Sequence, residues 1–552
     1  MAIDLIWLGD ASSSPPWHGG EVYCVQSRPG NVADFVGRYL QRTTAEAVLF
    51  WSSLLGLPEL AQIEQLLESP ADIWHAGLKL GTSGLPHIIN FVMPTWMLNR
   101  DPEPFIEATS WRLTFDACLV RTEVLRQLGG PRPEFRTLLG AGLEFGHRCI
   151  MRGALVRHVP TLAPDVPERG RLTLPPEDEI EFLLQRFHGW QRYWALFRAA
   201  ATRHLSPVAV FRGLYRARRT NVSPTKAIYI PRQCATAEPV SGRVTVLIPT
   251  LYRYSYLRTV LRQLRTQTVK PHEIIVVDQT AVADRDTSIA QEFQDLPLKI
   301  FYLGQAGQCT SRNLGLQHAT GDYILFIDDD DEISDDLIES HLVRIQQFDV
   351  SSGIADEVGA GALPENFTFF RTSDVFPTNN TLIRKDILLK SGLFDLAYDH
   401  GQRADGDLGM RVYLSGALMV LDPQITVLHH HAPRGGLREH RARVITRASS
   451  RQSLVQRHLP TVSELYLGQR YFSTLQQREA LLLRILGTFR VSGSRWKQLS
   501  KVLISSVLLP HTMFHIRKVR RLAKSMSKIF PQISELDLQT SADSYAVSHP
   551  DK

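Results

Sequence analysis

Short apolar runs alternate with segments of helical periodicity in the central part of the chain. The runs at residues 244–249, 273–278, 299–303 and 323–327 are rich in β-branched and aromatic residues, which predicts strands. Residues 256–267 and 307–318 between them predict helices. Alternating strands and helices of this kind indicate an α/β fold with a parallel sheet covered on both faces.

The pattern continues after residue 378 with weaker alternation. Residues 379–392 predict a strand that enters a helix, residues 405–416 a helix that ends in glycine, and residues 418–428 a strand that leads into His429, His430 and His431. Ligands of open α/β sheets bind at the carboxyl ends of the strands. The polar residues that follow each run are therefore the candidates for chemistry.

The first half of the chain echoes the second. Residues 119–129 resemble residues 382–392, and the match continues without a gap until Gly153 pairs with Gly416. Residues 47–51 likewise resemble residues 323–327. Internal repeats of this kind reorganise a fold prediction. We expect residues 1–165 to be a degenerate copy of the second half; chance similarity between two helix-capping patterns is the alternative.

The expected copy has lost the acidic residues of the second half, and the stretch before Phe50 is too short for a full nucleotide-binding half. Ser52, Ser53 and Leu54 stand where the second half has three aspartates, and Gly142 stands where it has Asp405. The copy is therefore expected to keep a scaffold and to lack the chemistry.

Composition sets broad limits on the class of protein. The chain has 552 residues, 43% hydrophobic and 21% charged, which suits a globular protein of two to four domains. Its net charge of +6 suits an anionic partner or a plain solvated surface. Five scattered cysteines without a Cys-x-x-Cys pair argue against a disulfide framework or a zinc site and fit a reducing compartment. Without a signal-peptide pattern or an apolar run of spanning length, we expect a cytoplasmic location.

The segments outside the central domain are expected to be helical or disordered. Residues 166–240 predict a helical linker, and residues 437–535 a helical, basic region. In the latter, an apolar stretch at 501–510 precedes a basic one at 515–524. This order suits peripheral binding to an anionic membrane surface, or a helix packed on the enzyme domain. Residues 536–552 are polar and are expected to be disordered.

Four consecutive aspartates follow the strand at residues 323–327. Such a run at a sheet edge is repulsive unless a cation compensates it, and carboxylate oxygens suit Mg²⁺ or Mn²⁺, which in turn bind diphosphates. A solvated acidic loop or a helix cap that continues through Asp335 and Asp336 is the alternative interpretation.

Five motifs occur in order: Ile-Pro-Thr at 248–250, Ile-Val-Val-Asp at 275–278, Ser-Arg-Asn-Leu-Gly at 311–315, residues 321–330 with the aspartates, and Asp-Gly-Asp-Leu-Gly-Met-Arg at 405–411. The set resembles the family 2 glycosyltransferases of the GT-A fold over residues 244–431. The resemblance implies a catalytic domain at residues 241–436 with a nucleotide-sugar donor, an Asp-x-Asp motif and a bound Mn²⁺ or Mg²⁺.

The resemblance also implies roles for individual residues. It implies nucleotide-sugar contacts from Thr250, Asp278, Arg312, Asp328 and Asp329; metal ligands among Asp328, Asp330 and either His429 or His430; and a general base at Asp405, which Asp407 could orient. Two positions depart from the family pattern, because Gln279 follows Asp278 and Ala404 replaces the usual glutamate before Asp405. The first departure leaves the nucleotide base open.

Each of these residues has a plainer interpretation. Asp278 could cap a turn, Arg312 could be a structural ion-pair partner, and Asp405 could cap the helix that it begins. The histidine triplet could suggest zinc, but neighbouring residues of a strand point to opposite faces.

The expected function is an inverting transfer of a sugar to a hydroxyl acceptor, in which a carboxylate takes the acceptor proton in a single displacement. Bacterial surface polysaccharide or glycolipid assembly is the setting that the resemblance implies, with a glycan or glycolipid acceptor. The main alternative is a non-catalytic carbohydrate-binding or scaffold protein. A nucleotidyltransferase would need a Gly-rich phosphate loop, and a nucleic-acid binder would need stacking aromatics among its basic residues. We find neither pattern and expect no nucleic-acid partner.

Overall fold

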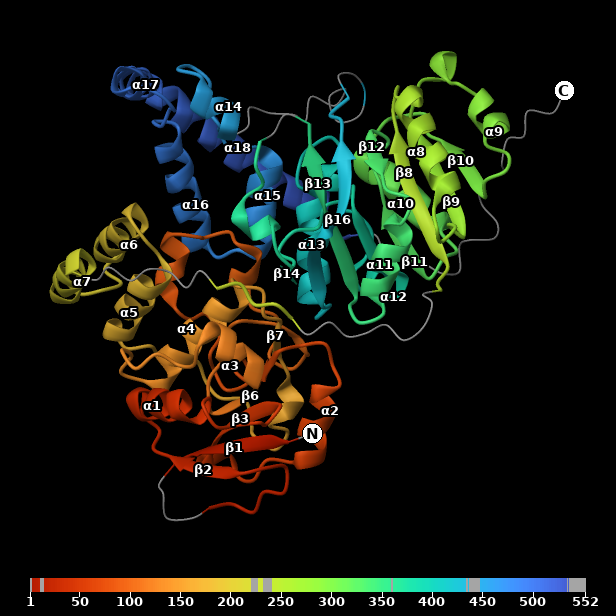
Figure 1. Cartoon of the computed structure of the whole chain (residues 1–552). Coiled ribbons are helices and arrows are strands. Elements are labelled where there is room, and N and C mark those ends of the chain that lie inside the picture. Colours follow the sequence, from red (N-terminus) through yellow and green to blue (C-terminus); the bar gives the residue numbers. More distant parts are fainter. Residues whose placement is uncertain are drawn as a thin grey trace.

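The computed structural model folds the chain into two sheets, each covered by helices, together with further helices that pack beside them (Figure 1). It describes residues 2–9, 14–219, 227–231, 241–358, 361–432, 435, 447–533 and 535. The predicted linker end at residues 232–240 and the predicted disordered tail at 536–552 lie outside the described residues.

The sheet of the second half is the one that the apolar runs predict. Its strand order is β10-β9-β8-β11-β15-β13-β16-β12, with β14 beside β16. The strands are β8 (Val244–Thr250), β9 (Glu273–Asp278), β10 (Leu298–Tyr302), β11 (Tyr323–Phe326), β12 (Asp331–Ile333), β13 (Val350–Glu357), β14 (Arg371–Thr372), β15 (Thr381–Arg384) and β16 (Met419–His429). The α/β class is confirmed, but the sheet is mixed, because β15 runs antiparallel to both of its neighbours.

Helices cover both faces of this sheet. They are α8 (Tyr254–Thr266), α9 (Ser288–Glu292), α10 (Gln308–His318), α11 (Leu337–Ile345), α12 (Lys385–Ser391) and α13 (Ala404–Leu414). Along β8, Val246 and Ile248 pack in one core with Leu257 of α8, whereas Leu247 belongs to the core on the other face. Burial on both faces explains why the strands read as continuous apolar runs.

The first half forms a seven-stranded sheet of order β2-β1-β3-β6-β4-β7-β5. Its strands are β1 (Ile3–Leu8), β2 (Val22–Val25), β3 (Ala47–Ser52), β4 (Ile73–His75), β5 (Ala108–Thr109), β6 (Ala117–Arg121) and β7 (Val156–His158), and its helices are α1 (Pro29–Tyr39), α2 (Leu60–Leu67), α3 (Thr122–Leu128) and α4 (Leu138–Ile150). Only two strands precede β3, whereas β8, β9 and β10 precede β11. The sheet of the first half therefore has no counterpart of the edge strand β10.

The two sheets share strand order, strand direction and register. β3 pairs with β6 so that Ala47 faces Arg121, and β11 pairs with β15 so that Tyr323 faces Arg384. The helices that follow, α3 and α12, both end at a glycine of positive φ, Gly129 (79°) and Gly392 (78°).

Arg148 and Arg411 occupy equivalent places on α4 and α13. Each donates hydrogen bonds to three successive backbone carbonyls at the C-terminal end of α3 or α12: those of residues 128–130 for Arg148 and of residues 391–393 for Arg411. Each also pairs with an acid four residues earlier on its own helix, Glu144 or Asp407. An arginine thus closes the same loop in both halves, buried in the case of Arg148 and mostly buried in the case of Arg411.

The halves contact each other through equivalent loops. A side chain at Gly416 would place its Cβ 2.4 Å from the carbonyl oxygen of Glu107, and one at Gly153 would place it 2.9 Å from that of Phe370. Arg157 donates a hydrogen bond of 3.0 Å to the carbonyl oxygen of Gly416. The close backbone approach therefore needs glycine at both places.

Further helices extend from the two halves. The linker forms α5 (Pro176–Arg186), α6 (Trp190–Ala201) and α7 (Pro207–Arg219), and the C-terminal region forms α14 (Arg447–Gln452), α15 (Val462–Tyr471), α16 (Thr474–Gly487), α17 (Arg495–Val507) and α18 (Leu509–Ile529), in line with the helical prediction for both segments. Among the described residues no single helix has the length and apolarity to cross a bilayer. The pair α17 and α18, bent by 58°, meets those criteria only when taken together.

Candidate active site

The ends of three neighbouring strands bring the predicted site residues together. Thr250 ends β8 and pairs in register with Asp278, the last residue of β9. β11 runs parallel to β8 on its other side, and the aspartates begin two residues after its end. The parallel direction of these strands therefore gathers the predicted residues at one edge of the sheet.

Asp328, Asp330 and His429 form a cluster with the composition of a metal site. One potential ligand atom from each residue lies within 4.8 Å of the others. The antiparallel pairing of β12 with β16 places Asp331 opposite His429, which returns the end of β16 to the aspartates. Two carboxylates and an imidazole suit Mn²⁺ or Mg²⁺, so the residues present fit such an ion.

Three cationic side chains surround the aspartates. Arg312 donates to Asp328 over 3.0 Å, and Arg253 Nη1 lies 3.0 Å from Asp329 and 2.9 Å from Asp330. His429 Nδ1 lies 2.8 Å from Asp331. The acidic run is therefore no solvated loop, because Asp329, Asp330 and Asp331 are each at most 3% exposed.

Burial changes the proton affinity of these groups. It raises the pKa of Asp328, and it raises the pKa of Asp329 and of Asp331 to about 7 in each case, against the opposing effect of the nearby cations. Burial would lower the pKa of His429, but its hydrogen bond to Asp331 and the other carboxylates raise it to about 9. Protons thus offset part of the negative charge, as a divalent cation would.

Asp278 and Thr250 both form hydrogen bonds with other residues of the site. Asp278 accepts hydrogen bonds from the Tyr254 hydroxyl (2.7 Å) and from the Thr280 N–H (2.9 Å), and Thr250 donates to Asp329 (2.7 Å). The bond to Thr280 is the turn cap that the sequence leaves open for Asp278. Gln279, which replaces the second acid of the family pattern, accepts a bond of 2.8 Å from the Gly307 N–H at the start of α10.

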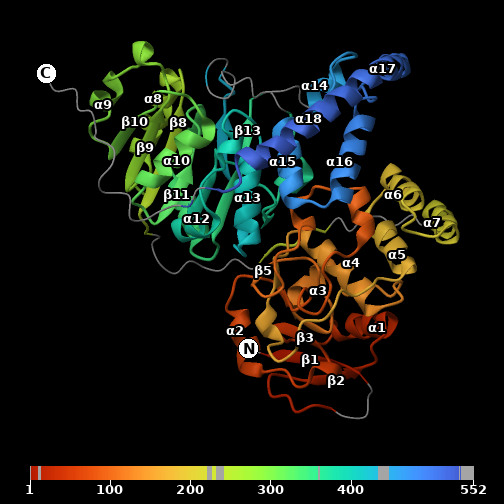
Figure 2. The same cartoon turned by 180° about the vertical axis from the view of Figure 1, so that it is seen from behind.

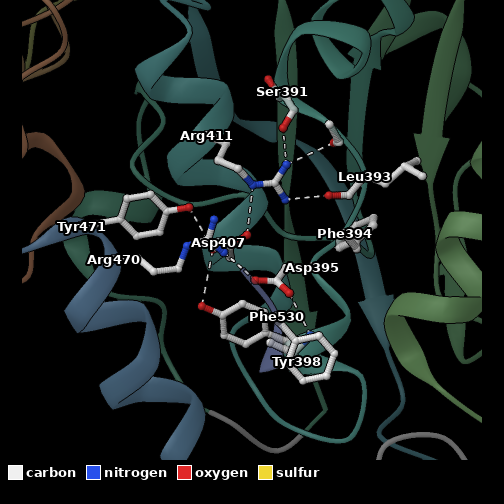
Figure 3. Close-up of polar contacts among 12 residues, drawn as sticks. Ser391, Leu393, Phe394, Asp395, Tyr398, Asp407, Arg411, Arg470, Tyr471 and Phe530 are labelled. Atoms are coloured by element: carbon white, nitrogen blue, oxygen red, sulfur yellow. Dashed lines mark hydrogen bonds and ion pairs between the residues drawn. The ribbon is translucent and has the colours of Figure 1, made fainter. Parts of the chain in front are cut away.

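Asp405 and Asp407 occupy very different environments on α13. Asp405 is exposed in the first turn, whereas Asp407 is buried. Figure 3 shows Asp407 accepting bonds from Arg411 (3.0 Å), Arg470 (3.0 Å) and Tyr471 (2.8 Å). Asp407 therefore joins α13 to α15. The described contacts include no hydrogen bond between Asp407 and Asp405, so they do not support the hypothesis that Asp407 orients Asp405.

The rings of His429 and His431 lie 4.4 Å apart, whereas His430 turns to a different partner, in keeping with alternation along a strand. His430 Nε2 lies 2.6 Å from Glu332, outside the cluster, and His431 Nε2 lies 3.2 Å from Glu357. Of the two predicted histidine ligands, the geometry therefore brings His429 to the aspartates and not His430.

Arg253 belongs to the site although the sequence hypothesis did not include it. It follows β8 by three residues and is the N-cap of α8, where it reaches both Asp329 and Asp330. A basic residue soon after the first strand was the available signal. Only the position of the aspartates across the sheet edge gives it a meaning.

Residues 245–382 match the family model described as glycosyl transferase family 2. The chain contains a family 2 glycosyltransferase domain. The family match and the sheet together confirm the expected GT-A fold for this domain.

Similar proteins bear glycosyltransferase names. The chain is 29% identical over 199 residues to glycosyltransferase GlyA of Streptococcus pneumoniae, covering 32% of this chain and 28% of that protein. It is 37% identical over 101 residues to the putative glycosyltransferase EpsH of Bacillus subtilis, covering 18% and 29%.

A third relative is the GalNAc(5)-diNAcBac-PP-undecaprenol beta-1,3-glucosyltransferase of Campylobacter jejuni. It is 33% identical over 95 residues, which cover 16% of this chain and 30% of the relative. The chain thus spans less than a third of the length of each of these relatives. Among solved structures, S. aureus TarS 1-349 in complex with UDP-GlcNAc aligns with 54% of this chain and 95% of that one, at 16% identity and a TM-score of 0.32.

Proposed function

We propose that the family 2 domain transfers a sugar from a nucleotide-diphospho-sugar to a hydroxyl acceptor, with inversion and with a divalent metal. The observation that carries this proposal is the cluster of Asp328, Asp330 and His429 at the carboxyl edge of the sheet. A metal held by these three residues would neutralise the charge that develops on the departing nucleoside diphosphate.

The chain's own side chains supply the remaining steps. Arg312, already paired with Asp328, and Arg253, paired with Asp329 and Asp330, would bind the diphosphate oxygens. Asp278 and Thr250 would line the nucleoside pocket at the ends of β8 and β9. Asp405, exposed in the first turn of α13, would take the proton from the acceptor hydroxyl as the hydroxyl oxygen attacks the anomeric carbon. One displacement of this kind inverts the anomeric configuration.

We assign the first half to a degenerate GT-A-like copy. The shared strand order, the shared registers and the equivalent Arg148 and Arg411 loops support this assignment. Ser52 ends β3, where the second half continues into its aspartates. The copy would act as a scaffold or hold an acceptor glycan rather than carry out transfer.

The acceptor is proposed to be a glycan or glycolipid of bacterial surface polysaccharide assembly, used at the inner face of the membrane. One relative is named for a polyprenol-linked substrate, which favours a lipid-linked acceptor. The basic C-terminal helices would bring the domain to such an acceptor.

The experiment is a donor-hydrolysis assay with a panel of UDP-, GDP-, dTDP- and CDP-sugars and Mn²⁺, followed by proton NMR of the released sugar. We expect hydrolysis of one donor class, with the first-formed sugar inverted at its anomeric carbon. A retained configuration would refute the single displacement. No hydrolysis and no binding of any donor would favour the carbohydrate-binding scaffold instead.

A further inference from the structure

Two segments of the chain are free of acidic residues over an unusual length. Residues 182–237 contain ten Lys and Arg residues and no Asp or Glu, and residues 480–534 contain eleven and again none. The whole chain carries 56 acidic residues in 552, so each gap is far longer than the average spacing. These segments include α6 and α7 in the linker and α17 and α18 near the C-terminus.

Helix α17 turns its apolar side outward. Its buried residues are Lys501 and Ser505, and Lys501 donates to the carbonyl oxygens of Ser453 (2.8 Å) and Gln456 (2.7 Å). Its large apolar residues are exposed: Trp496 by 78%, Leu499 by 55%, Leu503 by 69% and Val507 by 79%. A water-soluble surface helix normally shows the opposite arrangement.

Helices α6 and α7 also expose large apolar side chains. Their buried faces combine small residues, Ala195 and Ala199 of α6 and Gly213 and Ala217 of α7, with the larger Arg192, Leu196 and Val210. Aromatic and apolar residues at helical spacing face outward: Trp190, Tyr193 and Phe197 on α6, and Val208, Phe211 and Tyr215 on α7. Outward tryptophan and tyrosine beside basic residues are typical of membrane–water interfaces.

Direct contacts join the two helical segments. Arg198 of α6 forms a bidentate ion pair with Glu479 of α16, with both bonds at 2.7 Å. Arg490, which precedes α17, lies 5.1 Å from the ring of Trp190. Figures 1 and 2 both show α6, α7 and α17 on the side of the molecule away from β8, β9 and β10. The three helices thus lie on the same side of the molecule.

We propose that α6, α7 and α17 form one interfacial surface that inserts its apolar side chains into the headgroup region of an anionic phospholipid membrane. The exposed basic residues of α7 and α18, such as Arg212 and Arg219, and Arg517 and Lys524, bind the lipid phosphates around it. The inference deepens the proposed transfer to a lipid-linked acceptor and rests on that function for its purpose.

Charge argues for lipid rather than for a second copy of this chain. A symmetric self-association through this surface would bring the same basic residues of two copies together, which is repulsive. A negatively charged bilayer satisfies the basic residues and the apolar face at once. The absence of acidic residues from both segments removes the repulsion that such a membrane would otherwise exert.

The test is flotation of the purified full-length chain with vesicles of phosphatidylcholine alone and with vesicles that contain phosphatidylglycerol. We expect binding to the anionic vesicles, weakened by salt. The double variant Trp496→Ser/Leu503→Ser and the variant Phe211→Ser should each weaken binding about tenfold. Leu54→Ser, at a side chain that is 84% exposed in the first half, is the matched control and should bind as the unaltered chain does.

Several results would overturn the proposal. One is that the chain binds neither kind of vesicle. A second is that Leu54→Ser loses as much binding as the apolar variants do. A third is that the apolar variants convert an oligomer to a monomer in size-exclusion chromatography without weakening vesicle binding. Nucleotide binding by the same proteins, measured without vesicles, reports on the transferase site separately. Loss of vesicle binding with intact nucleotide binding therefore distinguishes this surface from the proposed function.

Discussion

The Nδ1 atom of His429 lies 3.8 Å from an Oδ1 atom of Asp330, so the end of β16 meets the loop that follows β11. The two residues lie far apart in the sequence, and the antiparallel pairing of β12 with β16 brings them together. The proposed metal site therefore depends on the fold of the whole domain.

The protonation of His429 predicts a pH-dependent metal affinity. Its pKa is raised from 6.5 to about 9, so the metal-free fold holds a proton there, and a metal must displace it. The stability from this proton is full below pH 6.5 and lost as pH rises through 9. The apparent Mn²⁺ affinity should rise about tenfold per pH unit in that window. Calorimetry in buffers of different ionisation enthalpy would measure the released proton, and the same slope in His429→Asn would exclude His429 as its source.

Arg253 is predicted to compete with the metal for the aspartates. The carboxylates of Asp329 and Asp330 hold its pKa above the usual range despite burial. Arg253→Met should lower the free energy of unfolding of the metal-free protein by about 3–5 kcal/mol, because it leaves buried carboxylates uncompensated. Mn²⁺ should restore more stability to this variant than it adds to the unaltered protein.

Urea unfolding with and without Mn²⁺ checks this prediction. Arg258→Met is its control, because Arg258 lies on the same helix but pairs with Asp286 and Glu292 away from the cluster. An equal Mn²⁺ effect in all three proteins would show that Arg253 and the metal do not share ligands.

Asp405 and Asp407 should separate chemistry from stability. Asp405→Asn should keep the fold and donor binding but lower the transfer rate by about 10²- to 10⁴-fold, the usual contribution of a general base. Asp407→Asn removes a charge buried beside Arg411 and Arg470 and should lower the free energy of unfolding by about 3–5 kcal/mol. Thermal unfolding and transfer rates measured on both variants would show whether each change affects chemistry or stability. Normal transfer by Asp405→Asn would move the base elsewhere.

The contact between the halves should be sensitive at Gly416. Its φ of 93° and the short distance to the Glu107 carbonyl make a side chain costly in two ways. Gly416→Ala should lower the free energy of unfolding by about 2–4 kcal/mol, from backbone strain and overpacking together. Gly56→Ala is the control, because Gly56 has a φ of 77° and no heavy atom within 4 Å of its Cβ position. Equal effects in a urea titration would show that the contact adds nothing beyond strain.

The sequence predicted the strands of the family 2 domain closely because they are buried on both faces. The prediction for β9 at residues 273–278 coincides with the observed strand. Those for β8 and β11 differ by one residue at one end, and that for β10 by one residue at each end. The short strands β12 and β14 carry no apolar run, and they form only because β16 offers them an edge. Their presence could not be foreseen from local pattern.

The candidate site was predictable in its residue types and less so in its geometry. The aspartates, Arg312 and His429 were expected and do meet. Arg253 and the pairing of His430 with Glu332 were not expected, because both depend on which strands become neighbours. The sequence also did not predict that the apolar faces of α6 and α17 point outward, because periodicity gives a helix two faces without showing which one is buried.

The most direct test of the central claim is thermal unfolding of the unaltered chain and of Asp330→Asn with nucleoside diphosphates, with and without Mn²⁺. Ligands that bind the native state raise its stability. We predict that one nucleotide raises the Tm of the unaltered chain only with Mn²⁺, that Asp330→Asn loses this gain, and that the exposed control Asp336→Asn keeps it. A gain that is independent of Mn²⁺, or that survives in Asp330→Asn, would contradict the proposed metal site.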